Sequence, residues 1–161
     1  MKLIRISTDM QLSVHEFPCG DHREQNQFLC ALIGNDCRIY EHVMPGRLYS
    51  ELHMKNRPTG VSGQCVSMLV DEEGLLKENE SNLIGSYLYE TDRHGDPIMG
   101  NLLLVGEEWA GDGIDFCGIE DSVFEHLHSQ LAHMVGVMKE TKEVHTYGIS
   151  VPVSLIEITP N

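Results

Sequence analysis

The chain has 161 residues, of which 41% are hydrophobic, and it carries a formal net charge of −14 at pH 7. This length predicts one domain spanning residues 1–161, large enough to fold without a disulfide or a metal ion. No apolar run reaches about 18 residues, so the sequence predicts no membrane-spanning helix. Five widely spaced cysteines without a C-x-x-C pair favour reduced thiols, and the first residues lack a signal-peptide pattern, so we expect a cytoplasmic location.

The charge is unevenly distributed along the chain. Residues 71–125 contain fifteen carboxylates and only two cationic side chains, for a net charge of −13. Residues 37–70 instead carry four cationic side chains and two carboxylates. The acidic part repels nucleic acid, whereas the basic part can hold a small anion. We therefore expect no direct binding of nucleic acid.

The first part of the chain predicts a β-hairpin followed by a helix. Residues 2–8 and 11–17 have the pattern of two short strands joined by a polar turn. Asp21 followed by Glu24 is typical of a helix start, and the apolar spacing that follows predicts a helix ending at Gly34.

The middle of the chain predicts strands separated by irregular segments. Residues 37–44 and 64–70 have the composition of strands, and residues 45–63, which are rich in glycine and proline, predict a long loop between them. Residues 80–90 suit either a short helix or a strand, and the pattern leaves both open. The other predictions in this part are turns at residues 92–97 and 112–115 and a buried strand at residues 98–105.

The last part predicts a long amphipathic helix and a closing strand. Ser122 and Glu125 match a capping box, and apolar residues then recur at helical spacing as far as Met138. Residues 143–158 have a strand pattern. Together the elements predict an α+β domain, namely a mostly antiparallel sheet with two principal helices packed on one face.

One segment resembles a known family. Residues 68–76 read Met-Leu-Val-Asp-Glu-Glu-Gly-Leu-Leu and are similar to small phage and mobile-element proteins known only as domain of unknown function 3846. The similarity continues at Asn82 and at residues 98–105 and covers about residues 25–120, so residues 121–161 are an added helix and strand. The resemblance implies a phage or plasmid accessory protein, and it carries no established catalytic residues to transfer.

A cluster of basic and aromatic residues is the candidate ligand site. Arginine binds phosphate through paired hydrogen bonds, and an aromatic ring stacks on a nucleotide base. The candidates are Arg38 on the strand before the long loop and, within the loop, Arg47, Tyr49, His53, Lys55, Asn56 and Arg57. In so acidic a chain, guanidinium groups can also serve only to neutralise nearby carboxylates, and the sequence leaves that alternative open.

Three functions are consistent with these patterns. The first is a phage-type anti-defence protein that sequesters a small anionic, nucleotide-like signal in the host cytoplasm, as a homo-oligomer. The second is an inhibitor whose acidic surface imitates DNA toward a host defence protein. The third is a metal-dependent hydrolase using His126 and His133, although the chain lacks the i, i+4 histidine pair of zinc enzymes. No nucleotide-binding or nucleophile motif is present, so we predict a non-enzymatic protein without a cofactor or a metal site.

Overall fold

The computed structural model describes residues 1–146 of the chain, which form six strands and five helices. The elements are β1 Lys2–Ile6, β2 Leu12–Glu16, α1 His22–Ile33, β3 Tyr40–Val43, α2 Gly46–Glu51, β4 Cys65–Asp71, α3 Leu83–Tyr89, α4 Thr91–His94, β5 Leu102–Ala110, β6 Gly113–Cys117 and α5 Asp121–Thr146.

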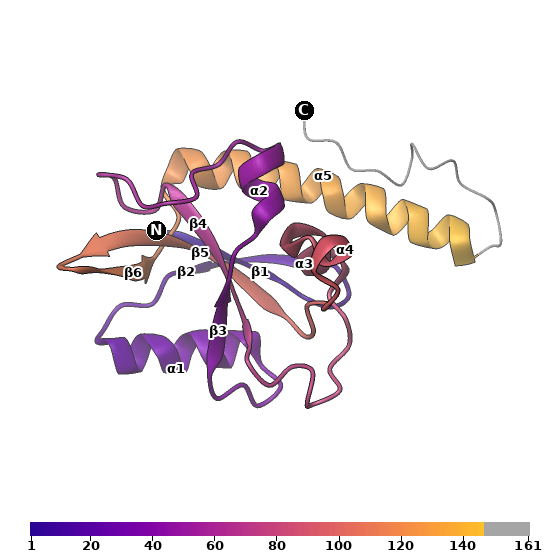
Figure 1. The fold of residues 1–161 in the computed structure, drawn as a ribbon, viewed down its shortest axis with the longest axis horizontal. Coiled ribbons are helices and arrows are strands. Elements are labelled where there is room, and N and C mark those ends of the chain that lie inside the picture. The colour runs from indigo at the N-terminus through magenta and orange to yellow at the C-terminus, as the bar shows by residue number, and fades with distance from the viewer. Residues whose placement is uncertain (147–161) are drawn as a thin grey trace.

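The six strands form one antiparallel sheet with β5 at its centre (Figure 1). The strand order is β2-β1-β5-β4-β3, and β6 pairs with the second half of β5. The first half of β5 pairs with β1 through Ile4 and Leu104, while β4 lies along its other edge with Met68 opposite the same leucine. The predicted α+β fold and the mostly antiparallel sheet are therefore confirmed.

Helices cover both faces of this sheet, so the prediction that the two principal helices share one face is wrong. Leu103 and Val105 of β5 pack with Leu29 and Ile33 of α1 in one core. The alternate residues of β5, such as Leu104, pack in a second core with α2, α3 and α5. Figure 1 shows α1 and α5 on opposite sides of the sheet. Successive strand side chains point to opposite faces, so the apolar run that opens β5 requires a cover on each side.

The predictions for the N-terminal part are confirmed. β1 and β2 form a hairpin in which Ile6 lies opposite Leu12. The Asp21 carboxylate accepts a 2.9 Å hydrogen bond from the Glu24 backbone N–H and so caps α1. Gly34 ends the helix with a φ of 78°, a conformation that glycine adopts at low cost. These contacts set the residues at which α1 begins and ends.

Three connecting segments are more helical than the sequence patterns indicate. The predicted loop at 45–63 contains α2, which Leu48 anchors because it is fully buried. Residues 80–90, for which the sequence leaves helix and strand undecided, contain α3. The side chain of its cap residue Asn82 accepts a hydrogen bond from a first-turn N–H and donates to two backbone carbonyls. The predicted turn at 92–97 begins inside α4. These short helices depend on tertiary contacts for their stability, and such contacts cannot be inferred from the helix propensity of the local sequence.

The hairpin of β5 and β6 differs from the predicted strand at 98–105 and the predicted turn at 112–115. β5 begins at Leu102 and continues to Ala110. The chain then turns back to form β6, which includes most of the residues predicted as a turn. Glu107 lies inside β5 although it is charged. This charged residue interrupts the apolar run in the sequence, so the sequence pattern does not show the full length of the strand.

α5 begins one residue before Ser122, and Glu120 caps it, so the predicted capping role of Ser122 is wrong. The Glu120 carboxylate accepts from the Ser122 hydroxyl at 2.5 Å and from the Val123 N–H at 3.1 Å, and these bonds hold its pKa below the ordinary value. Within the predicted strand at 143–158, residues 143–146 belong to α5 and the rest lies outside the described residues. Neither α5 nor any other described helix is long and apolar enough to cross a membrane.

Candidate ligand-binding site

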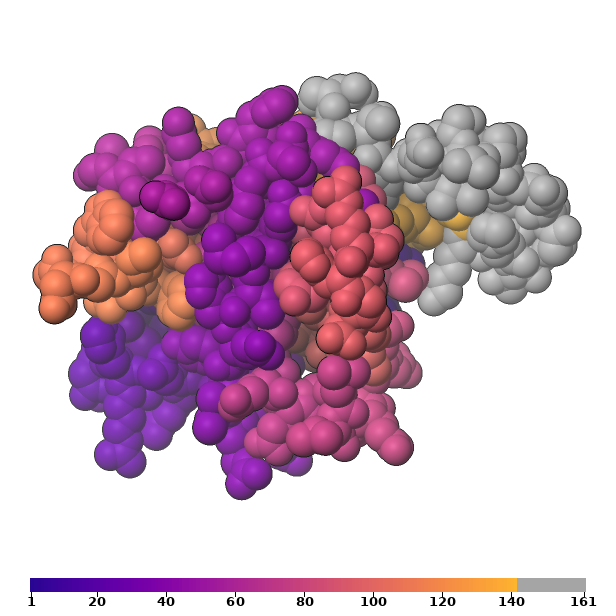
Figure 2. Space-filling view, in the orientation of Figure 1, coloured from indigo at the N-terminus to yellow at the C-terminus, as the bar shows by residue number. Residues whose placement is uncertain are grey.

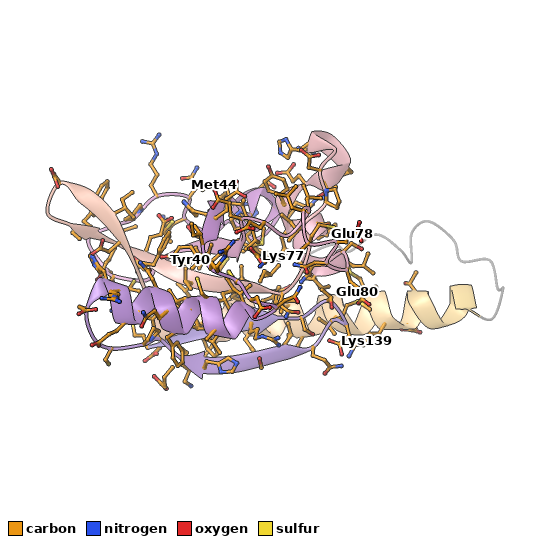
Figure 3. All side chains as sticks on the ribbon, turned by 90° about the horizontal axis from the view of Figure 1, so that it is seen from below. Tyr40, Met44, Lys77, Glu78, Glu80 and Lys139 are labelled. Carbon is orange, nitrogen blue, oxygen red and sulfur yellow. The ribbon has the colours of Figure 1, made fainter. Side chains whose placement is uncertain are left out.

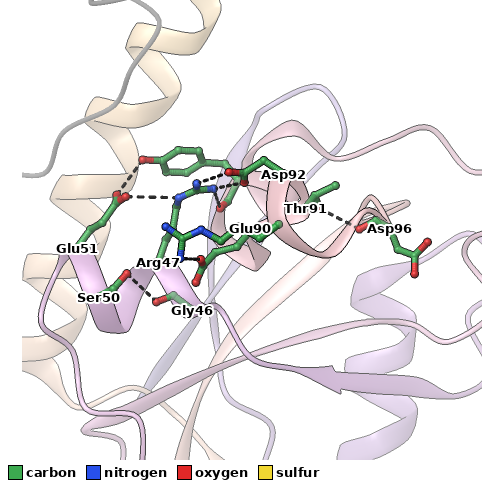
Figure 4. A network of polar contacts seen from close by, with 10 residues as sticks. Gly46, Arg47, Ser50, Glu51, Glu90, Thr91, Asp92 and Asp96 are labelled. Atoms are coloured by element: carbon green, nitrogen blue, oxygen red, sulfur yellow. Dashed lines mark hydrogen bonds and ion pairs between the residues drawn. The ribbon is translucent and has the colours of Figure 1, made fainter.

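Arg47 lies in a closed polar network between α2 and the α3–α4 region (Figure 4). Its guanidinium donates to both carboxylate oxygens of Asp92, at 2.7 and 2.8 Å, and to the Tyr87 carbonyl at 2.8 Å. The group also lies 4.4 Å from the centroid of the Tyr87 ring and 3.4 Å from the Glu51 carboxylate. Hydrogen bonding raises the pKa of Arg47 and lowers that of Asp92. Arg47 therefore neutralises carboxylates and joins these elements.

Tyr49 is also part of the packed structure. Its hydroxyl donates to the Val66 carbonyl at 2.8 Å, and its ring packs against the core beneath α2, α3 and α5. Burial raises the pKa of this hydroxyl above its ordinary value. The contact ties the segment after β3 to β4, so the ring is not presented for stacking on a ligand.

His53 and Lys55 line a small groove beside the N-terminus of α5. The groove has a volume of about 250 Å³ and also contains His126. The helix terminus there is already capped by a carboxylate, which weakens its attraction for an anion. Asn56 and Arg57 are exposed on the loop that follows.

Arg38 is exposed and held only by a weak surface contact. Its side chain is 78% exposed, and its ion pair with Glu73 is 3.5 Å long. Exposed pairs of this kind contribute little to stability and compete weakly with a ligand. The structure thus does not bring the seven candidate residues together. Arg38, the Arg47 network and the groove with Lys55 are separate places in the fold.

A larger depression, which we call the arginine groove, lies between α1 and the segment that precedes β3. It has a volume of about 700 Å³, and no carboxylate lines it. Its lining residues are Arg23, Asn26, Gln27, Cys30, Ala31, Cys37 and Arg38. Burial raises the pKa of the Cys37 thiol to about 12, so this thiol stays protonated. The groove therefore offers cations and amides, which suit binding of an anion.

Sequence reasoning missed the α1 side of this groove. Arg23, Asn26 and Gln27 lie three and four residues apart on a helix whose bounds the sequence predicts correctly, and such residues share one face. That spacing is a signal that could have found them. Their proximity to Arg38 could not be predicted, because it depends on how the connector returns to the sheet.

Lys77 holds the connector that carries Arg38. Its ammonium group donates to the carbonyls of Asn35 and Asp36, at 3.1 and 2.9 Å, and to the buried Asp71 carboxylate at 2.7 Å. Figure 3 shows Lys77 beside the C-terminal end of α1. An anchored connector loses less conformational entropy when a ligand binds, so it favours the preorganisation of Arg38.

A second cavity, which we call the aromatic slot, adjoins the arginine groove and shares Asn26 with it. The slot has a volume of about 180 Å³, and it is lined by Phe17, His22, Gln25, Asn26, Leu29, Tyr40, Ile114, Asp115 and Phe116. The Tyr40 hydroxyl donates to Asn26 Oδ1 at 2.6 Å, and the rings of Tyr40 and Phe116 meet edge to face. Figure 2 shows the surfaces of α1 and the β5–β6 hairpin, which supply most of this lining, next to each other.

A buried carboxylate lies beside the slot. Glu107 is 3% exposed and faces Phe116 across the β5–β6 pairing. It accepts hydrogen bonds from the Ser67 hydroxyl and the Cys65 thiol, and His42 Nε2 lies 3.2 Å away. Burial opposes ionisation of Glu107, yet these hydrogen bonds hold its pKa below the ordinary value.

This polar cluster is not arranged as a catalytic triad. In a triad, the two histidine nitrogens contact the nucleophile and the carboxylate separately. Here His42 Nε2 contacts both Ser67 Oγ, at 2.9 Å, and Glu107. Ser67 is fully buried, and burial raises the pKa of the Cys65 thiol to about 12, so neither side chain is an activated nucleophile. The cluster links side chains of neighbouring strands in the part of the sheet next to the slot.

Some acidic residues of segment 71–125 are engaged within the fold, whereas most of the others are exposed or half-buried. Asp71 and Glu107 are buried. Three others form ion pairs with arginines, namely Glu73, Glu90 and Asp92. These five carboxylates are therefore not free to imitate DNA phosphates, and the DNA-mimic alternative stays a prediction that depends on the remaining acidic residues.

No family model, curated protein or solved structure matches the chain. The resemblance at residues 68–76 therefore stays a prediction. Across the described residues, no group of three or more histidine, cysteine, aspartate or glutamate side chains is placed to hold a metal ion.

Proposed function

We propose that this protein binds a small anionic, nucleotide-like ligand without transforming it, and that the arginine groove holds the anionic end. The observation that carries the proposal is the absence of any carboxylate from a 700 Å³ groove flanked by Arg23 and Arg38, in a chain of net charge −14. Arginine forks match the paired oxygens of phosphate, and their charge is permanent. The surrounding acidic surface repels longer polyanions, so a small ligand fits better than nucleic acid.

The biological setting belongs to the same proposal. A phage-type accessory protein in the host cytoplasm could oppose a defence system by sequestering its nucleotide signal, and the resemblance at residues 68–76 supports this setting. The arginine groove is an open depression, and a homo-oligomer would supply a cover for it. Lack of an activated nucleophile in the cluster around Glu107 supports binding without catalysis.

Calorimetry with charge-matched variants tests this proposal. The protein is titrated with ADP, ADP-ribose and a cyclic dinucleotide, alongside the double variants Arg23→Ala/Arg38→Ala and Arg57→Ala/Arg93→Ala. Each double variant removes two exposed cations, so the nonspecific charge effect is the same. We expect the groove variant to weaken binding by at least about tenfold, because each charge-assisted hydrogen bond contributes about 1.5–3 kcal/mol.

The control variant should bind like the wild type. Mass spectrometry of ligand released by heating should recover it unchanged. Equal weakening in both double variants would show that only overall charge matters, and a modified ligand would show that the protein is an enzyme.

A further inference from the structure

The aromatic slot presents a different chemistry from the adjoining arginine groove. Three rings from separate parts of the chain, Phe17, Tyr40 and Phe116, line a cavity of about 180 Å³. That volume is several times the roughly 30 Å³ of a water molecule, so a planar heterocycle can enter it. Aromatic walls favour a planar ring, because stacking and edge-to-face contacts are both favourable.

Two amides in the slot retain complementary hydrogen-bonding capacity. Asn26 Oδ1 already accepts one bond from Tyr40, whereas the NH₂ group of that side chain keeps both of its donors. Gln25 Nε2 donates one bond to the Pro18 carbonyl at 3.3 Å, whereas its Oε1 acceptor keeps both lone pairs. Both side chains line the slot from neighbouring positions of α1. One donor beside one acceptor matches the adenine edge, which offers a ring nitrogen acceptor and an exocyclic amino donor.

The charges indicate how such a ligand would be oriented. Asp115 lines the slot, 3.2 Å from His22 Nε2, whereas no carboxylate lines the arginine groove. This carboxylate would repel a phosphate in the slot, whereas it would not repel a neutral base. Asn26 borders both cavities, so a single ligand can occupy the two together.

We infer that the aromatic slot is the base subsite of the proposed ligand site and that it selects a 6-aminopurine, with the phosphate held by Arg23 and Arg38. This inference rests on the proposed function. It adds that the ligand is an adenine nucleotide and that Gln25 and Asn26 read its base edge.

Calorimetry with three phosphate compounds tests the inference. AMP carries the amino group, IMP carries a carbonyl in its place, and ribose 5-phosphate lacks a base. We expect AMP to bind the wild type about tenfold more tightly than either competitor, because a site that hydrogen-bonds an amino group leaves polar atoms unpaired with the wrong base. Gln25→Ala should remove the preference for AMP over IMP and leave the affinity for ribose 5-phosphate unchanged. Alanine is compatible with this helical position, so the variant should fold.

The outcomes separate the inference from the proposed function. If AMP, IMP and ribose 5-phosphate bind equally, or if Gln25→Ala weakens all three alike, the base subsite is wrong while phosphate binding stands. If Arg23→Ala/Arg38→Ala leaves all three affinities unchanged, or none of the three compounds binds, both proposals are overturned.

Discussion

Arg38 and Arg47 carry the same group in the same basic segment, yet the fold gives them opposite surroundings. Arg47 is 13% exposed and holds both carboxylate oxygens of Asp92, whereas Arg38 is 78% exposed and has one ion-pair contact of 3.5 Å. The difference arises because α4 brings both oxygens of a carboxylate from 45 residues away to Arg47, while Glu73 meets Arg38 through a single exposed contact and does not line the arginine groove. Whether an arginine is available to a ligand therefore depends on the neighbours that tertiary structure supplies.

The largest expected effect comes from loosening the helix that forms one wall of the arginine groove. Leu29 is 1% exposed and packs α1 on the sheet, so Leu29→Ala should lower the free energy of unfolding by about 3 kcal/mol. The adjacent Phe28 is 43% exposed, and Phe28→Ala is the matched control with an expected loss under about 1 kcal/mol. Urea unfolding measures both. Equal losses would mean that α1 is not held by this core.

Replacing each of the two arginines in turn by an uncharged side chain tests the comparison between Arg38 and Arg47. Arg47→Met should lower the free energy of unfolding by about 2 kcal/mol, because several charge-assisted hydrogen bonds and a ring contact are lost. Arg38→Met should change it by less than about 0.5 kcal/mol. When both variants are titrated with ADP, Arg38→Met should weaken binding more than Arg47→Met. Similar stability losses would contradict the distinction between the two sites.

A smaller, pH-dependent effect is expected at the buried carboxylate. The pKa of Glu107 in the folded protein lies below its ordinary value of 4.5, so its ionised form stabilises the fold above that pH. Glu107→Gln should lower the free energy of unfolding by about 1 kcal/mol at pH 7. The difference in unfolding free energy between the wild type and this variant should shrink as the pH falls from 4.5 through the pKa of Glu107 in the folded protein. Thermal unfolding from pH 3 to 8 measures it, and a gap independent of pH would contradict the ionised state.

The parts of this fold that local signals define could be predicted from the sequence. The bounds of α1 follow from Asp21 and Gly34, and the hairpin and β4 follow from strand composition. α2 could not be predicted, because one buried leucine docks a six-residue segment that has no helical pattern of its own. The extent of β5 was hidden by Glu107, whose burial is possible only through partners on other strands.

The candidate site was only partly predictable for the same reason. Arg38 was predicted on a strand, but β3 begins only at Tyr40, so Arg38 lies in the connector before it. Arg23, which lines the same groove, lies on α1, and the two come together only through the tertiary fold. Arg47 and Tyr49 resemble ligand residues in sequence, and long-range contacts with Asp92 and Val66 engage them instead. Sequence composition thus could not show which basic residues the fold leaves open.

Backbone amide NMR shifts during titration with ADP test the central claim most directly. We predict that the largest shifts cluster on Arg23, Asn26, Gln27 and Arg38, around the arginine groove. Amides of His53, Lys55 and His126, around the groove beside α5, serve as the internal comparison. Shifts concentrated on that second group, or an absence of saturable shifts on the first, would contradict the claim.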